Sequence, residues 1–453
     1  MSERPRDPTV VLGGGLAGMA AAFALLDNGE PVVLLERRPF LGGRAFSFQD
    51  PESGAVIDNG QHVLVGACDR LRAFLDRIGS AAAFRRQRHL RLPILDGEGR
   101  RADLAAVPLP PPLHLAVGLL RYRHLDPASR VALIATAWRL AAAEVSRVDD
   151  LTLGDWLAAR DTPPATIERF WEPIVRPALN VPVAGASLPL SAFLMRRALW
   201  AGAGAGALWL PATGLSAAIG NPALSRLRDS GADVRLETRV AGLELGSGRI
   251  AGVRLRDGSG VPARRVVCAL PPGTTDGLLA DVGVMSDHAA LGRSAIVNVY
   301  LWYDRPVLEV PFAGTFGSPL QWVFDRSRLL GEEAGGWCVG VSLSAADDLL
   351  ERPKEHLAGL CDDALGEICP ARRRARLVRS AVVKEPGATF RAGPGVATRR
   401  PGPVTAIPGF FLAGDWTDTG WPATMEGAVR SGERAVAAAL AECRPEADPA
   451  GVS

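Results

Sequence analysis

The stretch TVVLGGGLAGMAAAFALLDNGEPVVLLERR, residues Thr9 to Arg38, decides the fold of the N-terminal part of the chain. Thr9 to Leu12 are an apolar run that is typical of a buried strand, and a glycine-rich turn follows at once. The alanine-rich residues Leu16 to Asp27 predict a helix, and Gly29 is placed to end it. Pro31 to Leu35 predict a second strand. Together these elements predict a strand–helix–strand unit of an α/β fold.

Three glycines of the turn follow the pattern of a dinucleotide-binding loop. Gly13 permits the tight turn, Gly15 lets the backbone approach a pyrophosphate, and Gly18 lets the helix pack closely on the strand. The helix N-terminus adds unpaired N–H groups and a partial positive charge. Glu36, at the end of the second strand, can accept hydrogen bonds from both hydroxyls of a ribose. A glycine-rich turn without a ligand does not explain Glu36, so the sequence predicts an adenine dinucleotide.

The residues that follow distinguish FAD from NAD. The segment ERRPFLGGRAFSF, Glu36 to Phe48, places Gly42, Gly43 and Arg44 where NAD dehydrogenases continue into a helix. It resembles the glutathione-reductase-like flavoproteins, which include amine oxidases and carotenoid desaturases and carry a Gly-Gly-Arg at this point. The resemblance implies FAD as the cofactor. Arg44 can pair with the pyrophosphate, and Val56 to Leu71 resemble the family segment that passes the flavin ring.

The stretch GDWTDTGWPATMEGAVRSG, Gly414 to Gly432, resembles the second FAD signature of the same family. Asp415 is expected to hydrogen-bond the ribityl chain or to lie against the phosphates. Pro422 suits the first turn of a helix, whose N–H groups around Met425 would face the N1–C2=O edge of the flavin and stabilise its reduced anion. Trp421 is extended before the proline and is expected either to wall the substrate pocket or to pack the turn.

The resemblance assigns cofactor contacts to the N-terminal, middle and C-terminal parts of the chain. In the middle part, the backbone at Val240 is expected to meet the adenine. The expected FAD contacts are Gly13, Gly15, Leu16, Ala17, Gly18, Glu36, Arg37, Gly43, Arg44, Gly60, Gln61, His62, Val240, Gly414, Asp415 and Met425.

The predicted fold is α/β, with an FAD-binding Rossmann-like domain of the glutathione-reductase type and an inserted mixed α+β substrate domain that is partly helical. The FAD-binding domain is discontinuous and consists of residues 1–71, 211–290 and 405–445, and the substrate domain consists of residues 72–210 and 291–404. The first insertion is mostly helical by pattern. Between Ala232 and Pro272, alternating apolar residues predict a three-stranded antiparallel meander and then a buried strand from Val266 to Leu270.

Two apolar stretches are candidates for membrane contact. Ala198 to Ser225 carry no charge, but their glycines and prolines do not suit a spanning helix, so a buried glycine-rich connection is expected. The segment PLPPPLHLAVGLLRYRHL, Pro108 to Leu125, is apolar first and basic after. It is too short to span a bilayer and suits a monotopic contact, with an ordinary core helix behind a proline-rich loop as the alternative.

Composition excludes several other classes of protein. The formal net charge of +2 does not suggest binding to nucleic acid. The six cysteines form no CxxC pair and the histidines are scattered, so no metal site is expected. The N-terminus carries no apolar signal segment. The predicted location is therefore the cytoplasm, with peripheral contact at the inner face of the cytoplasmic membrane as a further option.

Two segments narrow the resemblance to one branch of the flavoproteins. FWEPIVRPALNVPVAGASLPLSAFLMRRAL, Phe170 to Leu199, and NGQHVLVGA, Asn59 to Ala67, resemble the hydroxysqualene dehydroxylases, the squalene-associated flavoproteins of hopanoid synthesis. The resemblance implies the reaction hydroxysqualene + FADH2 → squalene + water + FAD, with hydride transfer from flavin N5 to an allylic carbon. It also implies an apolar isoprenoid substrate and an electron donor, which the sequence does not identify.

The reaction needs an acid that helps the hydroxyl leave. The candidates are His62 and Asp58, although His62 can equally be a structural histidine bonded to backbone. Trp171 and Trp421 are expected to line the substrate pocket. One alternative function is a carotenoid or phytoene desaturase, which runs the same fold in the oxidative direction. A second is a non-catalytic prenyl-lipid-binding protein, which would not need the intact FAD motifs.

Overall fold

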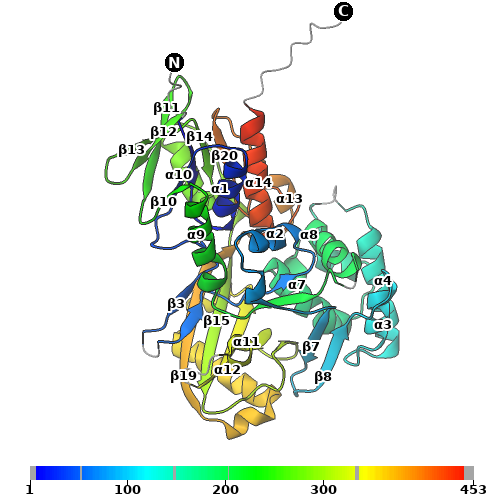
Figure 1. Cartoon of the computed structure of the whole chain (residues 1–453). Coiled ribbons are helices and arrows are strands. Elements are labelled where there is room, and N and C mark those ends of the chain that lie inside the picture. Colours follow the sequence, from blue (N-terminus) through cyan, green and yellow to red (C-terminus); the bar gives the residue numbers. More distant parts are fainter. Residues whose placement is uncertain (1–6, 52–53, 146–148, 203, 332–335, 443–453) are drawn as a thin grey trace, which may run out of the picture.

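A computed structural model describes residues 7–51, 54–145, 149–202, 204–331 and 336–442. In Figure 1 the N-terminal and C-terminal segments lie together in the upper half, around a parallel sheet. A second, larger sheet occupies the lower half, and a lobe of helices lies to one side. Segments far apart in the sequence therefore meet at the boundary between the two sheets, where the glycine-rich motifs lie.

The upper sheet has five parallel strands, in the order β10-β2-β1-β14-β20. Its strands are β1 (Thr9–Leu12), β2 (Val32–Leu35), β10 (Asp233–Arg235), β14 (Arg265–Cys268) and β20 (Phe410–Leu412). Strands β1, β2, β14 and β20 are buried along their whole length, which explains why the sequence shows continuous apolar runs there instead of alternation. The predicted Rossmann-like arrangement of strands from three distant parts of the chain is confirmed.

Helices α1 (Leu16–Asp27) and α14 (Met425–Ala441) pack against each other beside this sheet (Figure 1). Helix α1 is apolar on nearly all sides and is buried accordingly. The two helices approach most closely at Gly432, where an added Cβ would lie 2.2 Å from the carbonyl oxygen of Ala17 and 2.9 Å from the amide nitrogen of Ala21. A glycine is therefore required at this point of the helix pair.

The predicted antiparallel meander is confirmed, and it forms a separate sheet of three strands. Its strands are β11 (Val240–Gly246), β12 (Arg249–Leu255) and β13 (Gly260–Pro262). The buried strand predicted after the meander is β14. Three further helices complete this part of the chain, namely α2 (Asp69–Arg77), α9 (Asn221–Asp229) and α10 (Pro272–Ala280).

The lower sheet has seven strands in the order β19-β15-β18-β17-β16-β7-β8. These strands are β7 (Arg91–Leu95), β8 (Arg101–Ala105), β15 (Ser294–Tyr303), β16 (Phe312–Thr315), β17 (Trp322–Asp325), β18 (Trp337–Ser344) and β19 (Leu377–Thr389). The first insertion is mostly helical, as expected, but it also supplies β7 and β8 to this sheet. These two strands form a local antiparallel hairpin, and β7 joins the rest of the sheet through β16, more than 200 residues later in the chain.

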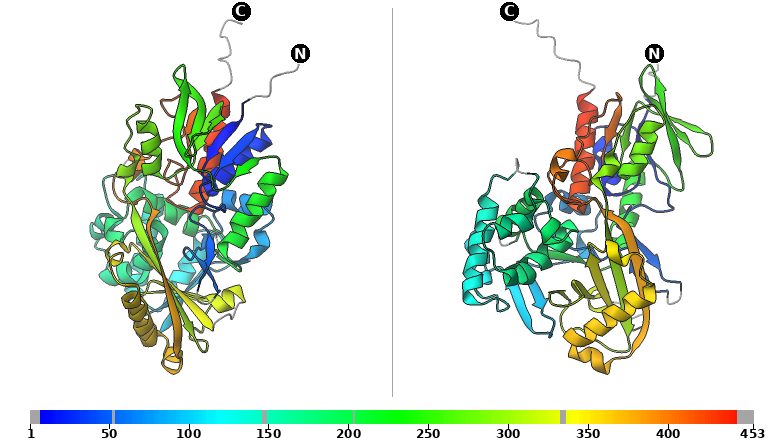
Figure 2. Two further views of the ribbon diagram at one scale, coloured as in Figure 1. Left: turned by 90° about the vertical axis from the view of Figure 1, so that its left-hand side faces the viewer. Right: turned by 180° about the vertical axis from the view of Figure 1, so that it is seen from behind.

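Helix α12 (Lys354–Ile368) covers one face of the long strands β15 and β19 (Figure 2). Val297, Val299 and Leu301 of β15 and Val382 of β19 belong to the apolar core that includes residues of this helix. Side chains alternate along a strand, so the even-numbered residues of β15 point away from α12. This second face of β15 and β19 is turned toward the N-terminal segment around Gly60.

The lateral lobe consists of helices on one side of the molecule (Figure 1). Its helices include α3 (Leu113–Leu120), α4 (Pro127–Ala142), α5 (Leu153–Ala158), α7 (Glu172–Leu179) and α8 (Leu188–Leu194), with π-helical turns at Ile167–Trp171 and Met195–Trp200. No helix in the described ranges is both long enough and apolar enough to cross a bilayer.

The stretch from Ala198 to Ser225 is more regular than the connection that the sequence predicts. It contains β9 (Leu208–Pro211), which pairs with β5 (Leu64–Val65) and β6 (Phe84–Arg86) in a small antiparallel sheet. A π-helical turn, Ser216–Gly220, then leads into α9. Composition alone did not predict β9, because the glycines around it indicated an irregular connection.

Candidate cofactor and active site

The glycine-rich turn forms the first half of a cradle for an anion. Gly15 caps α1 without any side-chain hydrogen bond, and the first helical turn carries no acidic residue. A Cβ at Gly18 would lie 1.9 Å from the carbonyl oxygen of Gly13, and one at Gly43 would lie 2.9 Å from the Cα of Gly15. There is thus no room for a side chain where the turn at Gly13–Gly18 meets the turn at Gly43. The uncapped N-terminus of α1 favours binding of a pyrophosphate there.

Glu36 is buried beside this turn, with 7% of its surface exposed. Its two carboxylate oxygens accept hydrogen bonds from the amide nitrogens of Gly14 at 2.7 Å and Arg38 at 2.8 Å. Each oxygen keeps a second lone pair for a ribose hydroxyl. The amide of Thr238 donates to the Glu36 carbonyl at 2.8 Å, which brings the start of β11, and with it Val240, close to the same place.

Arg38 organises the loop that leads to Gly43, and the sequence did not single it out. Its guanidinium donates to the Gly43 carbonyl at 2.7 Å and stacks on the ring of Phe46 at 4.7 Å. The neighbouring Arg37, which was expected to contact the cofactor, is exposed. Arg37 and Arg38 are adjacent in the sequence, so only the structure shows that Arg38 is the one that bonds to Gly43.

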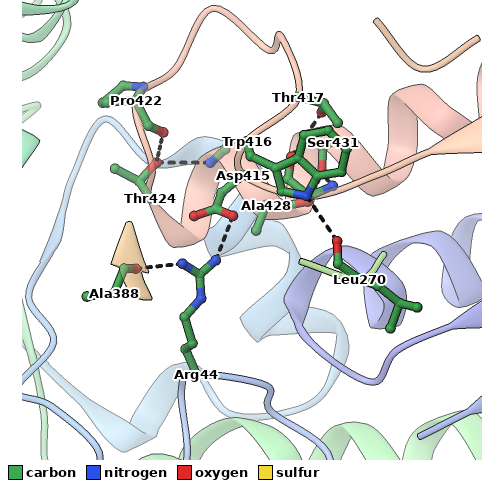
Figure 3. Close-up of polar contacts among 12 residues, drawn as sticks. Arg44, Leu270, Ala388, Asp415, Trp416, Thr417, Pro422, Thr424, Ala428 and Ser431 are labelled. Carbon is green, nitrogen blue, oxygen red and sulfur yellow. Dashed lines mark hydrogen bonds and ion pairs between the residues drawn. The ribbon is translucent and has the colours of Figure 1, made fainter. Parts of the chain in front are cut away.

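The C-terminal turn forms the second half of the cradle (Figure 3). Gly414 has a φ of 141°, and a Cβ there would lie 2.4 Å from Nε1 of Trp416. Its amide donates to the Ser431 hydroxyl at 2.8 Å, and the indole nitrogen of Trp416 donates to the Leu270 carbonyl at 3.1 Å. These bonds close the turn against α14 and against the loop after β14.

An ion pair joins the two halves of the cradle. Nη2 of Arg44 lies 2.6 Å from Oδ1 of Asp415, and Nη1 donates to the Ala388 carbonyl at 2.5 Å (Figure 3). The negative charge of Asp415 raises the pKa of Arg44. The Asp415 side chain is 9% exposed and that of Arg44 is 45% exposed, so the arginine remains accessible to an anionic group.

Helix α14 begins at Met425, three residues later than Pro422. The prediction that Pro422 occupies the first helical turn is therefore wrong. Thr424 is the capping residue, and its hydroxyl accepts a hydrogen bond from the amide of Gly427 at 3.0 Å. Pro422 lies in the loop, where its carbonyl accepts a hydrogen bond from the Thr424 hydroxyl at 3.2 Å.

Glu426 fixes the start of α14 to the start of α2. The carboxylate is fully buried and accepts hydrogen bonds from the amides of Arg70 at 3.2 Å and Leu71 at 2.7 Å, and from Nε of Arg430 at 2.6 Å. Burial raises the pKa of Glu426, which the three donors partly oppose. The partners on α2 lie more than 350 residues away, so the sequence could not reveal this contact.

Arg400 holds the loop between Asp415 and Trp421 by its backbone. The guanidinium is buried and donates to the carbonyls of Trp421 at 2.7 Å, Asp415 at 3.1 Å and Trp416 at 3.4 Å, and also to that of Thr417. Burial lowers the pKa of Arg400 to about 10. The arginine remains charged at neutral pH, and it satisfies carbonyl groups that no regular structure would pair.

Asp58, one of the two candidate acids, lies in a network of structural contacts. Its side chain is 1% exposed and forms an ion pair with Arg326 at 2.8 Å. Oδ1 also accepts hydrogen bonds from the Ser47 hydroxyl at 2.7 Å and the Leu215 amide at 2.9 Å. The same guanidinium donates to Oε1 of Gln61 at 2.9 Å. These donors occupy both carboxylate oxygens of Asp58 and hold the side chain in place.

His62 is bonded to backbone, as one of the two sequence-based interpretations expected. Its Nδ1 lies 2.8 Å from the Gly60 carbonyl oxygen and therefore carries the proton that is donated there. Burial lowers the pKa of His62, and the positive charge of Arg44 lowers it further. The ring is neutral at neutral pH with Nε2 unprotonated, so His62 can accept a hydrogen bond but does not supply a proton.

The two tryptophans assigned to the substrate pocket are both buried. Trp421 packs edge-on against Phe193 at 5.1 Å, with the guanidinium of Arg430 5.4 Å above its ring. It therefore packs the turn. Trp171 is fully buried in a π-helical turn, beside Phe170 at 5.2 Å, and its indole nitrogen has no hydrogen-bond partner among the described residues.

The face of β15 and β19 that is turned away from α12 carries polar groups next to the segment Asn59–His62. The side-chain nitrogen of Asn59 donates to Oε2 of Glu385 on β19 at 3.1 Å and to the Arg44 carbonyl at 3.3 Å. Asn298 of β15 is 1% exposed and accepts a hydrogen bond from the Gln61 amide at 3.4 Å. Asn298 and Glu385 were absent from the sequence-based candidates.

A family model described as flavin containing amine oxidoreductase matches residues 16–440 of this chain. The chain belongs to the flavin-containing amine oxidoreductases. It is 31% identical to the hydroxysqualene dehydroxylase of Rhodopseudomonas palustris over 96% of this chain and 98% of that protein. The corresponding protein of Sinorhizobium fredii is 30% identical over 95% and 98% of the two chains. The predicted membership of the hydroxysqualene dehydroxylase family is therefore confirmed.

Solved structures support the fold. An oxidoreductase from Methanosarcina mazei aligns with a TM-score of 0.73 at 17% identity, covering 96% of this chain and all of that one. Cyclohexylamine oxidase from Brevibacterium oxydans aligns with a TM-score of 0.66 at 19% identity, covering 97% and 99%. The predicted cofactor, FAD, agrees with membership of a flavin-containing family, and the side-chain-free cradle and buried Glu36 of this chain fit it.

Proposed function

We propose that the protein catalyses the reductive dehydroxylation of hydroxysqualene to squalene. The observation that carries the proposal is the similarity, over nearly the whole of both chains, to proteins named hydroxysqualene dehydroxylase. An intact cofactor cradle supports an enzyme over a non-catalytic lipid-binding protein, since its side-chain-free glycine turns and buried Glu36 fit a dinucleotide.

Each half of the cradle has a separate task in this proposal. The turn Gly13–Gly18 and the start of α1 hold the pyrophosphate, and Glu36 binds the ribose of the adenosine. The start of α14 would face the N1–C2=O edge of a bound flavin, where the helix N-terminus would stabilise negative charge. When bound, reduced FAD supplies a hydride from N5. The chain's own task is to bind and orient the allylic alcohol and to protonate its departing hydroxyl.

The experiment uses the purified protein with bound FAD, reduced under anaerobic conditions. Hydroxysqualene and phytoene are supplied separately, and the products are identified by mass spectrometry. Squalene formed in proportion to the flavin reoxidised is the expected result. A yellow, reducible protein that leaves hydroxysqualene unchanged would refute the proposed substrate, and a protein that never binds flavin would refute the enzyme itself.

A phytoene-type desaturase is the second candidate. The 15-cis-phytoene desaturase of an Oncidium hybrid cultivar is 26% identical over 95% of this chain and 78% of that protein. Such an enzyme removes hydrogen from its substrate and so requires oxidised flavin. In the same experiment, oxidised protein incubated with phytoene would then give a product with additional double bonds, while hydroxysqualene would remain unchanged.

We also propose that α3 and α4 dock on the inner face of the cytoplasmic membrane. Leu113 and Leu120, seven residues apart on α3, are 55% and 50% exposed, and Val131 and Trp138, seven apart on α4, are 60% and 50% exposed. A spacing of seven residues places each pair on one helix face. Both helices lie at the edge of the molecule (Figure 1). The apolar face suits an isoprenoid that must arrive from a bilayer.

Two arginines beside α3 indicate that the membrane partner contains anionic lipids. Arg121 and Arg123 follow α3 closely and line a depression of about 490 Å³ together with Arg91 and Arg101. Arginines next to an exposed apolar face attract anionic headgroups.

The test of this docking face is flotation with vesicles of phosphatidylglycerol and phosphatidylcholine. A Leu113→Ser/Leu120→Ser variant should lose binding, whereas Met285→Ser, which removes a side chain that is 90% exposed elsewhere, should not. Equal binding of all three proteins would refute the docking face.

A further inference from the structure

We propose that Glu385 is the acid that protonates the departing hydroxyl group of the substrate. The inference rests on the proposed dehydroxylation, and it names the residue that this reaction requires and that the sequence did not identify. Both earlier candidates are held by other groups, since Asp58 pairs with Arg326 and Nδ1 of His62 bonds to the Gly60 carbonyl.

The alternation of β19 directs Glu385 toward the cradle. Val382 packs in the core shared with α12, and Lys384 donates to the Leu350 carbonyl at 2.7 Å, so these even-numbered residues face that side. Glu385 points to the other face, opposite Ile296 of β15. On this face its Oε2 accepts a hydrogen bond from the side-chain nitrogen of Asn59, one residue before Gly60.

Glu385 also lies at the junction of the two halves of the cradle. Three residues further along the same strand, the Ala388 carbonyl accepts a hydrogen bond from the guanidinium of Arg44, which in turn pairs with Asp415 (Figure 3). Asn59 connects the two places, since its side-chain nitrogen lies 3.3 Å from the Arg44 carbonyl and 3.1 Å from Glu385. The carboxyl group is therefore held beside the segment that is expected to pass the flavin ring.

The other carboxylates near this face are committed to arginines. Asp58 pairs with Arg326, Asp50 with Arg379, and Asp415 with Arg44. Glu385 forms no ion pair within the described ranges, and its hydrogen-bond donors there are neutral, namely Asn59 and the amide of Gly387 at 3.3 Å. The guanidinium of Arg44 is a charged group close enough to interact with it. The Glu385 side chain is partly exposed, so it is accessible from solvent.

The step balances without any further reactant. The allylic C–O bond breaks, the hydroxyl leaves with the proton of Glu385 as water, and the carbon receives the hydride that reduced FAD supplies. The Glu385 carboxylate is then reprotonated from solvent. The Asn59 side chain donates to Oε2 and the Gly387 amide donates to Oε1, and each oxygen keeps a second lone pair that can carry the proton.

The experiment compares Glu385→Gln, Glu385→Asp and the control Glu355→Gln, each with its bound FAD. The amide of the Glu385→Gln variant can still accept the Asn59 hydrogen bond but cannot deliver a proton. We expect this variant to lower kcat about 10²- to 10⁴-fold, the usual contribution of a general acid. A required acid should also make the kcat of the wild type decline as the pH rises, and Glu385→Gln should lose that decline. Glu385→Asp should retain part of the rate, and Glu355→Gln, an exposed residue of α12 on the opposite side of the sheet, should behave as wild type.

A second substrate separates proton donation from a structural role. In the allylic fluoride analogue of hydroxysqualene, fluorine is close in size to the hydroxyl and leaves as a stable anion without protonation. The fluoride should restore turnover of Glu385→Gln to within about tenfold of wild type, while the flavin spectrum and FAD content remain unchanged. Undiminished turnover of hydroxysqualene, failure of the fluoride to rescue, or loss of FAD by Glu385→Gln would each overturn the assignment. Wild-type protein that converts neither compound would instead refute the proposed function.

Discussion

Replacing Gly432 with alanine tests whether the contact between α1 and α14 sets the cofactor cradle. The added Cβ would lie 2.2 Å from the Ala17 carbonyl oxygen and 2.9 Å from the Ala21 amide nitrogen. The first distance is about 1 Å shorter than van der Waals contact allows, and both atoms belong to the backbone of a buried helix. The two helices must therefore separate, which moves the N-terminus of each relative to the other.

The size of the effect follows from two opposing contributions. Overpacking in a well-packed region costs about 1–3 kcal/mol, whereas alanine stabilises a helix interior by about 1 kcal/mol relative to glycine. We expect Gly432→Ala to lower the free energy of unfolding of the FAD-free protein by up to about 2 kcal/mol. FAD is proposed to contact both helix ends, so its affinity should fall at least about tenfold, which corresponds to about 1.4 kcal/mol.

The assay measures urea unfolding of the FAD-free protein and FAD affinity by fluorescence quenching. Gly359→Ala provides a matched control, because Gly359 lies in α12 and an added Cβ there has no heavy atom within 4 Å. This control should be slightly more stable than wild type and bind FAD equally well. If Gly432→Ala matched Gly359→Ala in both measurements, the close helix contact would not set the cradle.

Three further outcomes follow from the charged and titratable groups. Asp415→Asn should change the stability of the FAD-free protein by no more than about 1 kcal/mol, because Arg44 is 45% exposed, yet it should lower retained FAD, measured as flavin absorbance per protein. The pKa of His62 in the folded protein lies below its ordinary value of 6.5. As the pH falls through 6.5, the unfolded chain therefore binds a proton before the folded chain does, and the free energy of unfolding decreases. His62→Gln should remove this part of the pH dependence of Tm, and an unchanged profile would contradict it. Arg326→Met should cost about 3–5 kcal/mol in urea unfolding by leaving Asp58 buried and unpaired, and adding Asp58→Asn should recover part of that loss.

Local signals explain what the sequence predicted well. The bounds of β1 and α1 agree with the structure because an apolar run, a glycine turn and an alanine-rich helix each act within a few residues. The start of α14 was wrong because two N-terminal signals compete there: Pro422 suits a first turn, and Thr424 suits a cap. Only the observed bond from the Gly427 amide to the Thr424 hydroxyl decides between them.

Contacts between distant parts of the chain explain the rest. Glu426 meets Leu71 across a separation of 355 residues, and Arg326 meets Asp58 across 268 residues. No local pattern marks a charged residue as buried in such a pair. Glu385 was missed for the same reason, since its position on a strand face matters only once β19 lies beside β15 and the Asn59 segment. The sequence thus showed which cofactor to expect, and the topology showed which carboxyl group could act beside it.

The role of Arg400 determines where this protein can be cut and recombined with its relatives. The terminal motif looks like a cassette that begins at β20, but the backbone carbonyls of Asp415, Trp416 and Trp421 are held by a side chain that precedes that strand by ten residues. A chimera joined at Phe410 would take the loop from one parent and Arg400 from the other. Its loop would then be held only if the other parent also has an arginine at the position of Arg400. The Arg400 guanidinium stacks on the ring of Phe390 at 4.9 Å. A junction upstream of Phe390 would therefore transfer the loop together with Arg400 and Phe390 from the same parent.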